Sequence, residues 1–115
     1  MVKVDEAFSI STGVRDGCQI IVVRGEIDEL TVPELEDALE ACPDGWPVIV
    51  DMSNVVFISS AGIHALLRDR PGQIALVCPP GNIMRLFEIV RANRRVPIFE
   101  DLDAAIQSAA LTCTA

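Results

Sequence analysis

The sequence has few of the side chains on which enzymatic sites depend. It contains one histidine, His64, and no tyrosine, and its isolated glycines form no phosphate-binding loop. A Ser-His-acid triad would require His64 to reach a serine four residues earlier on the same predicted helix. Metal-binding side chains are not clustered either. We therefore expect a protein that is not an enzyme and that holds no cofactor or metal.

Long apolar runs and a basic surface are also missing. No run approaches the roughly 20 apolar residues that span a membrane, and the N-terminal MVKVDEAF lacks the regions of a signal peptide. The net charge of −8 argues against nucleic acid as a partner, because phosphate binding needs a basic face. We expect a cytoplasmic protein, monomeric or weakly dimeric, that binds neither membrane nor nucleic acid.

Cysteine is present, but in no functional pattern. No pair has the C-x-x-C spacing, and the positions fit no zinc site. Disulfides are uncommon in the cytosol, so we expect reduced thiols that fill apolar positions and no disulfide. Redox control through a cysteine pair stays open as an alternative. The four cysteines are Cys18, Cys42, Cys78 and Cys113.

The charges are distributed unevenly along the chain. One segment holds seven acidic residues, and the later part of the chain holds a group of arginines. The simple interpretation of both groups is solvated helix faces. The alternative is that the acidic segment borders a surface that meets a basic protein partner. The acidic residues are Glu26, Asp28, Glu29, Glu34, Glu36, Asp37 and Glu40, and the arginines are Arg85, Arg91, Arg94 and Arg95.

The hydrophobic pattern predicts strands that alternate with helices in a single domain over residues 1–115. A turn at Arg15-Asp16-Gly17 joins the first two strands as an antiparallel hairpin, and the later strands should pair in parallel. The predicted fold is α/β, with a small mixed sheet of four to five strands and about four helices packed mainly on one side. Strands are expected at 7–14, 18–24, 48–50 with a further apolar run at 55–58, 73–78 and 96–99, and helices at 31–42, 60–68, 82–91 and 101–109.

Local signals predict where these elements turn or begin. A turn is expected at 51–54, inside the third strand region, and another at 70–72. Thr31 and Glu34 have the spacing of a capping box. Asn82 and Asp101 are predicted caps of the last two helices. The tail 111–115 is expected to be frayed. The helix near 82–91 is predicted to bury one face, formed by Ile83, Leu86, Phe87 and Val90.

Two serines mark the point where the central strand passes into a helix. The hydroxyl of Ser59 or Ser60 can cap that helix, and the helix N-terminus also stabilises a bound phosphate. Ala61 and Gly62 keep the first turn small, so that another chain could approach the backbone closely.

This stretch resembles the signature of the STAS domain. Its pattern is Asp-x-Ser-x-Val-x-Phe-Ile-x-Ser-x-Gly-Ile, from Asp51 to Ile63, and it is most similar to that of small bacterial anti-sigma factor antagonists. In that family the serine that matches Ser60 is phosphorylated by the anti-sigma factor, and the glycine two residues later matches Gly62. Ser59 stands where the family usually has aspartate, and it is the second candidate for phosphorylation. The stretch GEIDELTVPELEDAL is similar to the family segment that opens the first helix, and Asp28 matches its partner-contacting aspartate.

The resemblance, which covers nearly the whole chain, implies a STAS fold and a regulatory function. An unphosphorylated antagonist would bind an anti-sigma factor that is a serine kinase with an ATP-binding fold, and a sigma factor would be released. Phosphorylation would end the interaction, and a phosphatase would reset it. Two alternatives stay open, namely a STAS interaction module in a signalling complex without phosphorylation, and a thiol-regulated antagonist. The expected partner-binding residues are Glu26, Asp28, Thr31, Ser59, Ser60, Ala61, Gly62, Ile63 and His64.

Overall fold

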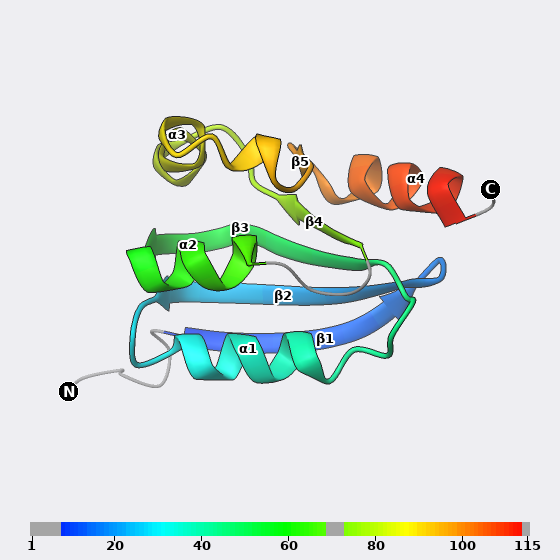
Figure 1. Ribbon diagram of the computed structural model, residues 1–115, viewed down its shortest axis with the longest axis horizontal. Coiled ribbons are helices and arrows are strands. Elements are labelled where there is room, and N and C mark those ends of the chain that lie inside the picture. The colour runs from blue at the N-terminus through cyan, green and yellow to red at the C-terminus, as the bar shows by residue number, and fades with distance from the viewer. Residues whose placement is uncertain (1–7, 69–72, 114–115) are drawn as a thin grey trace.

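The computed structural model describes residues 8–68 and 73–113, which form one mixed sheet covered by helices (Figure 1). The strands lie in the order β1-β2-β3-β4-β5; β1 and β2 are antiparallel, and all later pairs are parallel. The predicted α/β fold is confirmed. In chain order the elements are β1 (Phe8–Arg15), β2 (Cys18–Ile27), α1 (Val32–Glu40), β3 (Val48–Ile58), α2 (Ser60–Leu67), β4 (Ile74–Val77), α3 (Asn82–Ile89), the short 3-10 helix η2 (Ala92–Arg94), β5 (Ile98–Phe99) and α4 (Leu102–Cys113).

The hairpin between β1 and β2 forms as the sequence predicts. Asp16 and Gly17 both have positive φ, 52° and 80°, and Arg15 pairs with Cys18 across the turn. A two-residue loop with both residues left-handed matches the right-handed twist of the flanking strands. The turn therefore fixes the register of the whole antiparallel pair.

The predicted turn at 51–54 is wrong, because β3 runs unbroken from Val48 to Ile58. The local turn chemistry is nevertheless present: Asp51 Oδ1 accepts hydrogen bonds from the Ser53 amide at 3.0 Å and the Ser53 hydroxyl at 2.6 Å. The parallel pairing with β2 continues past this segment, with a register shift between Val22 and Arg24. Pairing with β2 along the whole of β3, and with β4 up to Asp51, therefore outweighs a local turn preference.

Two hydrophobic clusters lie on opposite faces of the sheet. In β2, Ile21 and Val23 join the larger cluster with α1, α2 and α3, whereas Cys18 and Ile20 join the smaller cluster with α4. Successive side chains of a strand point to opposite faces, which explains the division. Three helices thus share one face, as expected, and α4 covers part of the other.

Helix starts differ from the predicted caps in two of three cases. Thr31 precedes α1 but makes no side-chain capping bond, and α3 follows Gly81, with φ of 154°, rather than a cap at Asn82. Asp101 acts as predicted, because its Oδ1 accepts from the Ala104 amide at 2.8 Å. The Thr31 hydroxyl is directed back to the preceding segment instead, where it donates to the Glu26 carbonyl at 2.9 Å and accepts from the Asp28 amide at 2.9 Å.

The predicted buried face of α3 is only partly buried. Phe87 is fully enclosed, but the side chains of Leu86 and Val90 are 37% and 46% exposed. Helix α3 lies at the margin of the sheet (Figure 1). The core therefore buries only part of the apolar face that the sequence of this helix predicts.

Helix α4 continues to Cys113, through the first three residues of the tail that was expected to be frayed. The alanine-rich composition of this helix favours its extension. The predicted turn at 70–72 and residues 114–115 lie outside the described residues. Among the helices that the structure describes, none is long and apolar enough to cross a membrane.

Candidate functional site

The serine pair at the start of α2 is divided between a structural and an exposed role. Ser59 is extended, its amide donates to the Ile27 carbonyl at 2.8 Å, and its Oγ accepts from the Gly62 amide at 3.4 Å. Ser60 is the first residue of the helix, and its side chain is exposed. Ser59 therefore caps α2, and the interpretation of Ser60 as a plain cap is wrong.

Gly62 allows α2 to lie close against the sheet. A Cβ atom at this position would lie 2.6 Å from Cγ2 of Ile27 and 2.7 Å from Cγ1 of Ile58. Gly62 is buried, so its side-chain position faces the core and not a partner. Of the other expected contact residues on this helix, Ala61 and Ile63 are half-buried, and His64 is exposed.

The loop between β2 and α1 is closed by its own hydrogen bonds. Asp28 Oδ1 accepts from the amides of Leu30 at 2.9 Å and Thr31 at 3.1 Å. The Thr31 hydroxyl accepts from the Asp28 amide at 2.9 Å and donates to the Glu26 carbonyl. Because Ile27 binds the Ser59 amide, this loop lies directly beside the start of α2. Asp28 and Thr31 thus shape the surface next to the serine pair.

A groove of about 310 Å³ runs along α2 on the side of α3 and η2, and we call it the α2–α3 groove. Ser60 lies at its start and Arg68, eight residues later, at its far end. Arg95 Nη2 donates to the Leu67 carbonyl at 3.0 Å and so ties η2 to the end of α2. The groove is lined by Ser60, Ile63, His64, Leu67, Arg68, Val90 and Arg95.

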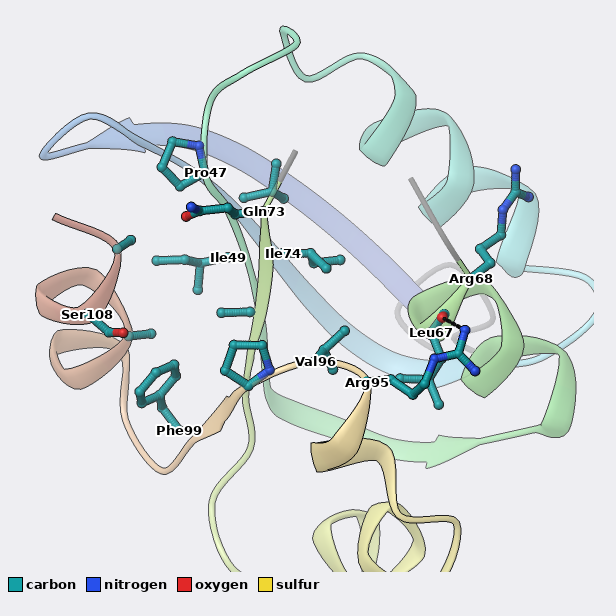
Figure 2. Close-up of a pocket in the computed structure, with 15 residues that line it drawn as sticks. Pro47, Ile49, Leu67, Arg68, Gln73, Ile74, Arg95, Val96, Phe99 and Ser108 are labelled. Atoms are coloured by element: carbon teal, nitrogen blue, oxygen red, sulfur yellow. Dashed lines mark hydrogen bonds between the residues drawn. The ribbon is translucent and has the colours of Figure 1, made fainter. Parts of the chain in front are cut away.

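A second hollow, of about 360 Å³, adjoins the α2–α3 groove and shares Leu67, Arg68 and Arg95 with it (Figure 2). It lies along the first half of β4, where β5 pairs only with Leu76 and Val77. Pro97 contributes to this gap, because proline has no N–H for a further ladder bond. The labelled side chains of Ile49, Val96 and Phe99 give the hollow apolar walls, and the dashed line in Figure 2 marks the Arg95 bond.

The two sides of α2 carry opposite charge. On the α1 side, residues 26–40 contain seven acidic and no basic side chains, a net charge of −7. On the α3 side, residues 82–95 contain four arginines and Glu88, a net charge of +3. The ion pair between Arg68 and Glu36, at 3.4 Å, links α2 to the acidic side. Ser60 therefore lies between an acidic and a basic surface.

The cysteines do not form a reactive site in the described part of the chain. Cys18 and Cys78 are buried, Cys42 is partly buried, and all three are thiols. Burial raises the pKa of Cys78 from 9.0 to about 11, so it stays a protonated, poorly nucleophilic thiol at neutral pH. Within residues 8–68 and 73–113, no group of three His, Cys, Asp or Glu side chains could hold a metal.

The sequence interpretation missed the groove residues Val90 and Arg95. Val90 was assigned to the core, and Arg95 to a solvated face. One signal was available: Leu86, Phe87, Ile89 and Val90 are too many apolar residues for a single stripe of a short helix.

The sequence profile of the STAS domain matches residues 9–105. The chain belongs to the STAS domain family. Two relatives of this STAS protein, from Listeria monocytogenes and Listeria innocua, are named anti-sigma-B factor antagonist. Each is 33% identical over 91 residues, which cover 71% of this chain and 80% of the relative.

Solved structures show the same fold. The crystal structure of an anti-sigma factor antagonist from Mycobacterium paratuberculosis has a TM-score of 0.77 and 25% identity, and the match covers 90% of this chain and 95% of that one. The anti-sigma factor antagonist SpoIIAA, in its unphosphorylated form, has a TM-score of 0.59 and 16% identity, with coverage of 89% and 96%. The predicted family is confirmed. Family members with this name are regulatory binding proteins rather than enzymes, as the sequence predicted.

Proposed function

We propose that this STAS protein is an anti-sigma factor antagonist that binds a kinase-type anti-sigma factor and thereby releases a sigma factor. The names of its relatives support the role. The observation that carries the switch is Ser60, which is exposed at the first position of α2 and makes no side-chain hydrogen bond to the described part of the chain, whereas Ser59 caps the helix. A kinase can reach the Ser60 hydroxyl without unfolding the helix start.

Phosphorylation of Ser60 would change the charge of the contact surface. A phosphate adds about −1.5 to −2 charges, next to a loop that already carries Glu26 and Asp28. The N-terminus of α2 offsets part of the cost while the phosphate is hydrated. A partner pressed onto the same surface would dehydrate it, so binding weakens.

The partner supplies the rest of the cycle. The anti-sigma factor holds the ATP and transfers its phosphate, and a separate phosphatase returns Ser60 to its unmodified form. The expected contact residues are Glu26, Asp28, Thr31, Ser59, Ser60, Ala61, Ile63 and His64, with Gly62 acting through its backbone. The protein would work in the cytoplasm, where sigma factors act, as a monomer or weak dimer.

The experiment is a pull-down from lysate of the source organism with four baits, followed by mass spectrometry. Wild type, Ser60→Ala and the control Ser9→Asp, a charge added on exposed β1, should retain a kinase-like anti-sigma factor. Ser60→Asp should lose it, by roughly 30- to 1000-fold in affinity if the added charge costs about 2 to 4 kcal/mol. Equal retention by all four baits would rule out the switch at Ser60, and absence of such a partner would rule out the antagonist role.

A STAS interaction module without phosphorylation is the second candidate, and Ser59 at the usual aspartate position favours it. Incubation of the recovered partner with ATP and each bait separates the two, because only the switch gives a phosphate on Ser60 that Ser60→Ala abolishes. A thiol-regulated antagonist has less support, because the pKa of Cys78 is raised to about 11 and the thiol is buried.

A further inference from the structure

We propose that the α2–α3 groove binds an acidic amphipathic segment of the partner, as a contact surface separate from the β2–α1 loop. The proposal rests on the proposed function for the identity of that partner, the anti-sigma factor. The proposal adds a second binding surface to the proposed function, and it specifies the chemistry of the segment that this surface binds.

The groove has three apolar lining residues, of which Ile63 and Leu67 also pack against the core and Val90 does not. Val90 is 46% exposed and lines the groove, and the neighbouring Ile89 is 68% exposed on α3. On the opposite wall of the groove, Ile63 and Leu67 of α2 are half-buried. Exposed apolar side chains such as Val90 and the adjacent Ile89, next to a groove, are typical of a protein contact surface. They provide anchoring positions for the apolar face of a partner segment.

The charge around the groove indicates an acidic occupant. Arg95 lines its far end together with Arg68, which is ion-paired with Glu36, and the exposed side chains of Arg91 and Arg94 follow α3, in a protein whose net charge is −8. Local positive charge on an acidic protein attracts an acidic segment and repels a basic one. A second copy of this chain is disfavoured by the mutual repulsion of two molecules that each carry −8.

The backbone at Arg91 supports a role for its side chain. Arg91 has φ of 59° and ψ of 42°, the left-handed conformation that favours glycine after a helix. An arginine there costs conformational energy, and it places a guanidinium beside the end of α3. Strain of this kind is often found at functional surfaces.

The groove also gives the Ser60 switch a direct mechanism. Ser60, His64 and Arg68 lie on one face of α2, and a rise of 1.5 Å per residue sets Ser60 and Arg68 about 12 Å apart along the axis. A phosphate on Ser60 would place negative charge at one end of the surface that holds the acidic segment. Like-charge repulsion would then act along the groove as well as at the β2–α1 loop.

Site-specific photo-crosslinking tests the proposal with the full chain. A benzophenone amino acid is placed at Val90 in the groove or, as control, at Val14, a valine that is 61% exposed on β1. Irradiation follows in lysate, and crosslinked peptides are sequenced by mass spectrometry. We expect the Val90 position to crosslink a segment of the anti-sigma factor with net negative charge and apolar residues at helical spacing, and Val14 not to do so.

The other outcomes overturn the proposal in distinguishable ways. Crosslinks from Val90 to a second copy of this chain, or to a basic segment, would contradict the predicted occupant. If a crosslinker at Glu29, in the β2–α1 loop, captures the anti-sigma factor while Val90 captures nothing, the groove proposal fails and the proposed function stands. If neither position captures an anti-sigma factor, both fail.

A charge reversal gives an independent measure. Arg94→Glu should weaken binding to the recovered partner about 3- to 10-fold at low salt, and the difference from wild type should shrink in high salt. Arg24→Glu, an exposed arginine on β2 away from the groove, is the matched control and should leave affinity within about twofold. Equal effects of the two reversals would show a general charge effect and overturn the assignment to the groove.

Discussion

The two sides of α2 differ in charge and in the way they are held, whereas both expose apolar side chains, including Leu30 at 88% on the acidic side. The β2–α1 loop on one side belongs to a segment of net charge −7, and Asp28 and Thr31 fix it by hydrogen bonds. The segment 82–95 on the other side carries +3 and exposes apolar side chains. The contrast indicates that a partner docking across both sides must match two opposite charges in one orientation. Such an arrangement excludes reversed docking through like-charge contacts.

The two sides also differ in how they are anchored to the sheet. The acidic side is joined to α2 through the Ser59 amide and the close contact of Gly62 with Ile27. The basic side is joined through a side-chain bond from Arg95 to the Leu67 carbonyl and through the buried side chains of Phe87 and Ala92. The acidic side is thus held beside α2 by backbone contacts near the helix start, and the basic side by a side chain that reaches the helix end.

The largest expected effect on stability comes from a substitution that forces α2 away from Ile27, which precedes the acidic β2–α1 loop. Gly62→Ala adds a Cβ within 2.7 Å of two isoleucine side chains, and we expect a loss of about 1–3 kcal/mol in the free energy of unfolding. The loss should appear although alanine is the better helix former by about 1 kcal/mol. Urea unfolding measures it. Gly13→Ala is the control, because nothing lies within 4 Å of its added Cβ, and an equal loss there would contradict the packing argument.

A smaller effect is expected when the acidic loop loses its bracing carboxylate. Asp28→Ala removes the acceptor for two amides and should cost about 1 kcal/mol, whereas Asp28→Asn keeps an oxygen acceptor and should cost less than half of that. Both variants remove one charge and should weaken partner binding to a similar degree. Thermal unfolding and binding titrations separate the two roles. Equal stability of the alanine and asparagine variants would show that the loop does not depend on these bonds.

On the basic side, stability and binding should change in opposite directions. Arg91→Gly relieves a left-handed arginine and should raise the free energy of unfolding by about 0.5–1 kcal/mol. The same change removes a charge beside the α2–α3 groove, and partner affinity should fall about threefold. Arg91→Ala is the matched control, since it removes the charge and keeps a Cβ at positive φ. A stabilised Arg91→Gly protein with undiminished affinity would remove Arg91 from the contact surface.

The smallest expected effect is the difference in stability between variants of Ser59 and of Ser60, the two serines that lie between the acidic and the basic surface. Ser59→Ala loses a capping bond that is long, at 3.4 Å, so we expect a cost of about 0.5 kcal/mol, or about 2–4 °C in Tm. Ser60→Ala should leave Tm unchanged within about 1 °C, because its side chain is exposed and the cap is elsewhere. Calorimetry of the two variants under identical conditions decides this. The reverse ranking would return the cap to Ser60.

Much of the fold could be predicted from the sequence because local patterns and final packing agree. The Asp16-Gly17 hairpin and the Asp101 cap depend only on neighbouring residues, and both formed as expected. The turn at 51–54 and the burial of Val90 were wrong. Whether residues 51–54 form a turn depends on the strands β2 and β4 that flank β3. Whether Val90 is buried depends on the position of α3 over the margin of the sheet.

The candidate site also has a part that could be predicted from the sequence and a part that could not. The serine pair and Gly62 lie in a continuous motif and could be found from the sequence, but which serine caps the helix depends on the exact end of β3. The α2–α3 groove brings Ser60 near Val90 and Arg95, some thirty positions away, and no local pattern encodes that meeting.

The sheet has its strands in the order in which they occur along the chain. Every strand after β1 therefore finds its first neighbour already made when it leaves the ribosome, and no strand has to wait for a later one to fill a gap. Short sequence separation between pairing partners favours rapid folding. The growing chain can add one strand at a time to a single edge, so β1, β2 and β3 can form a paired platform before the arginine-rich segment is synthesised.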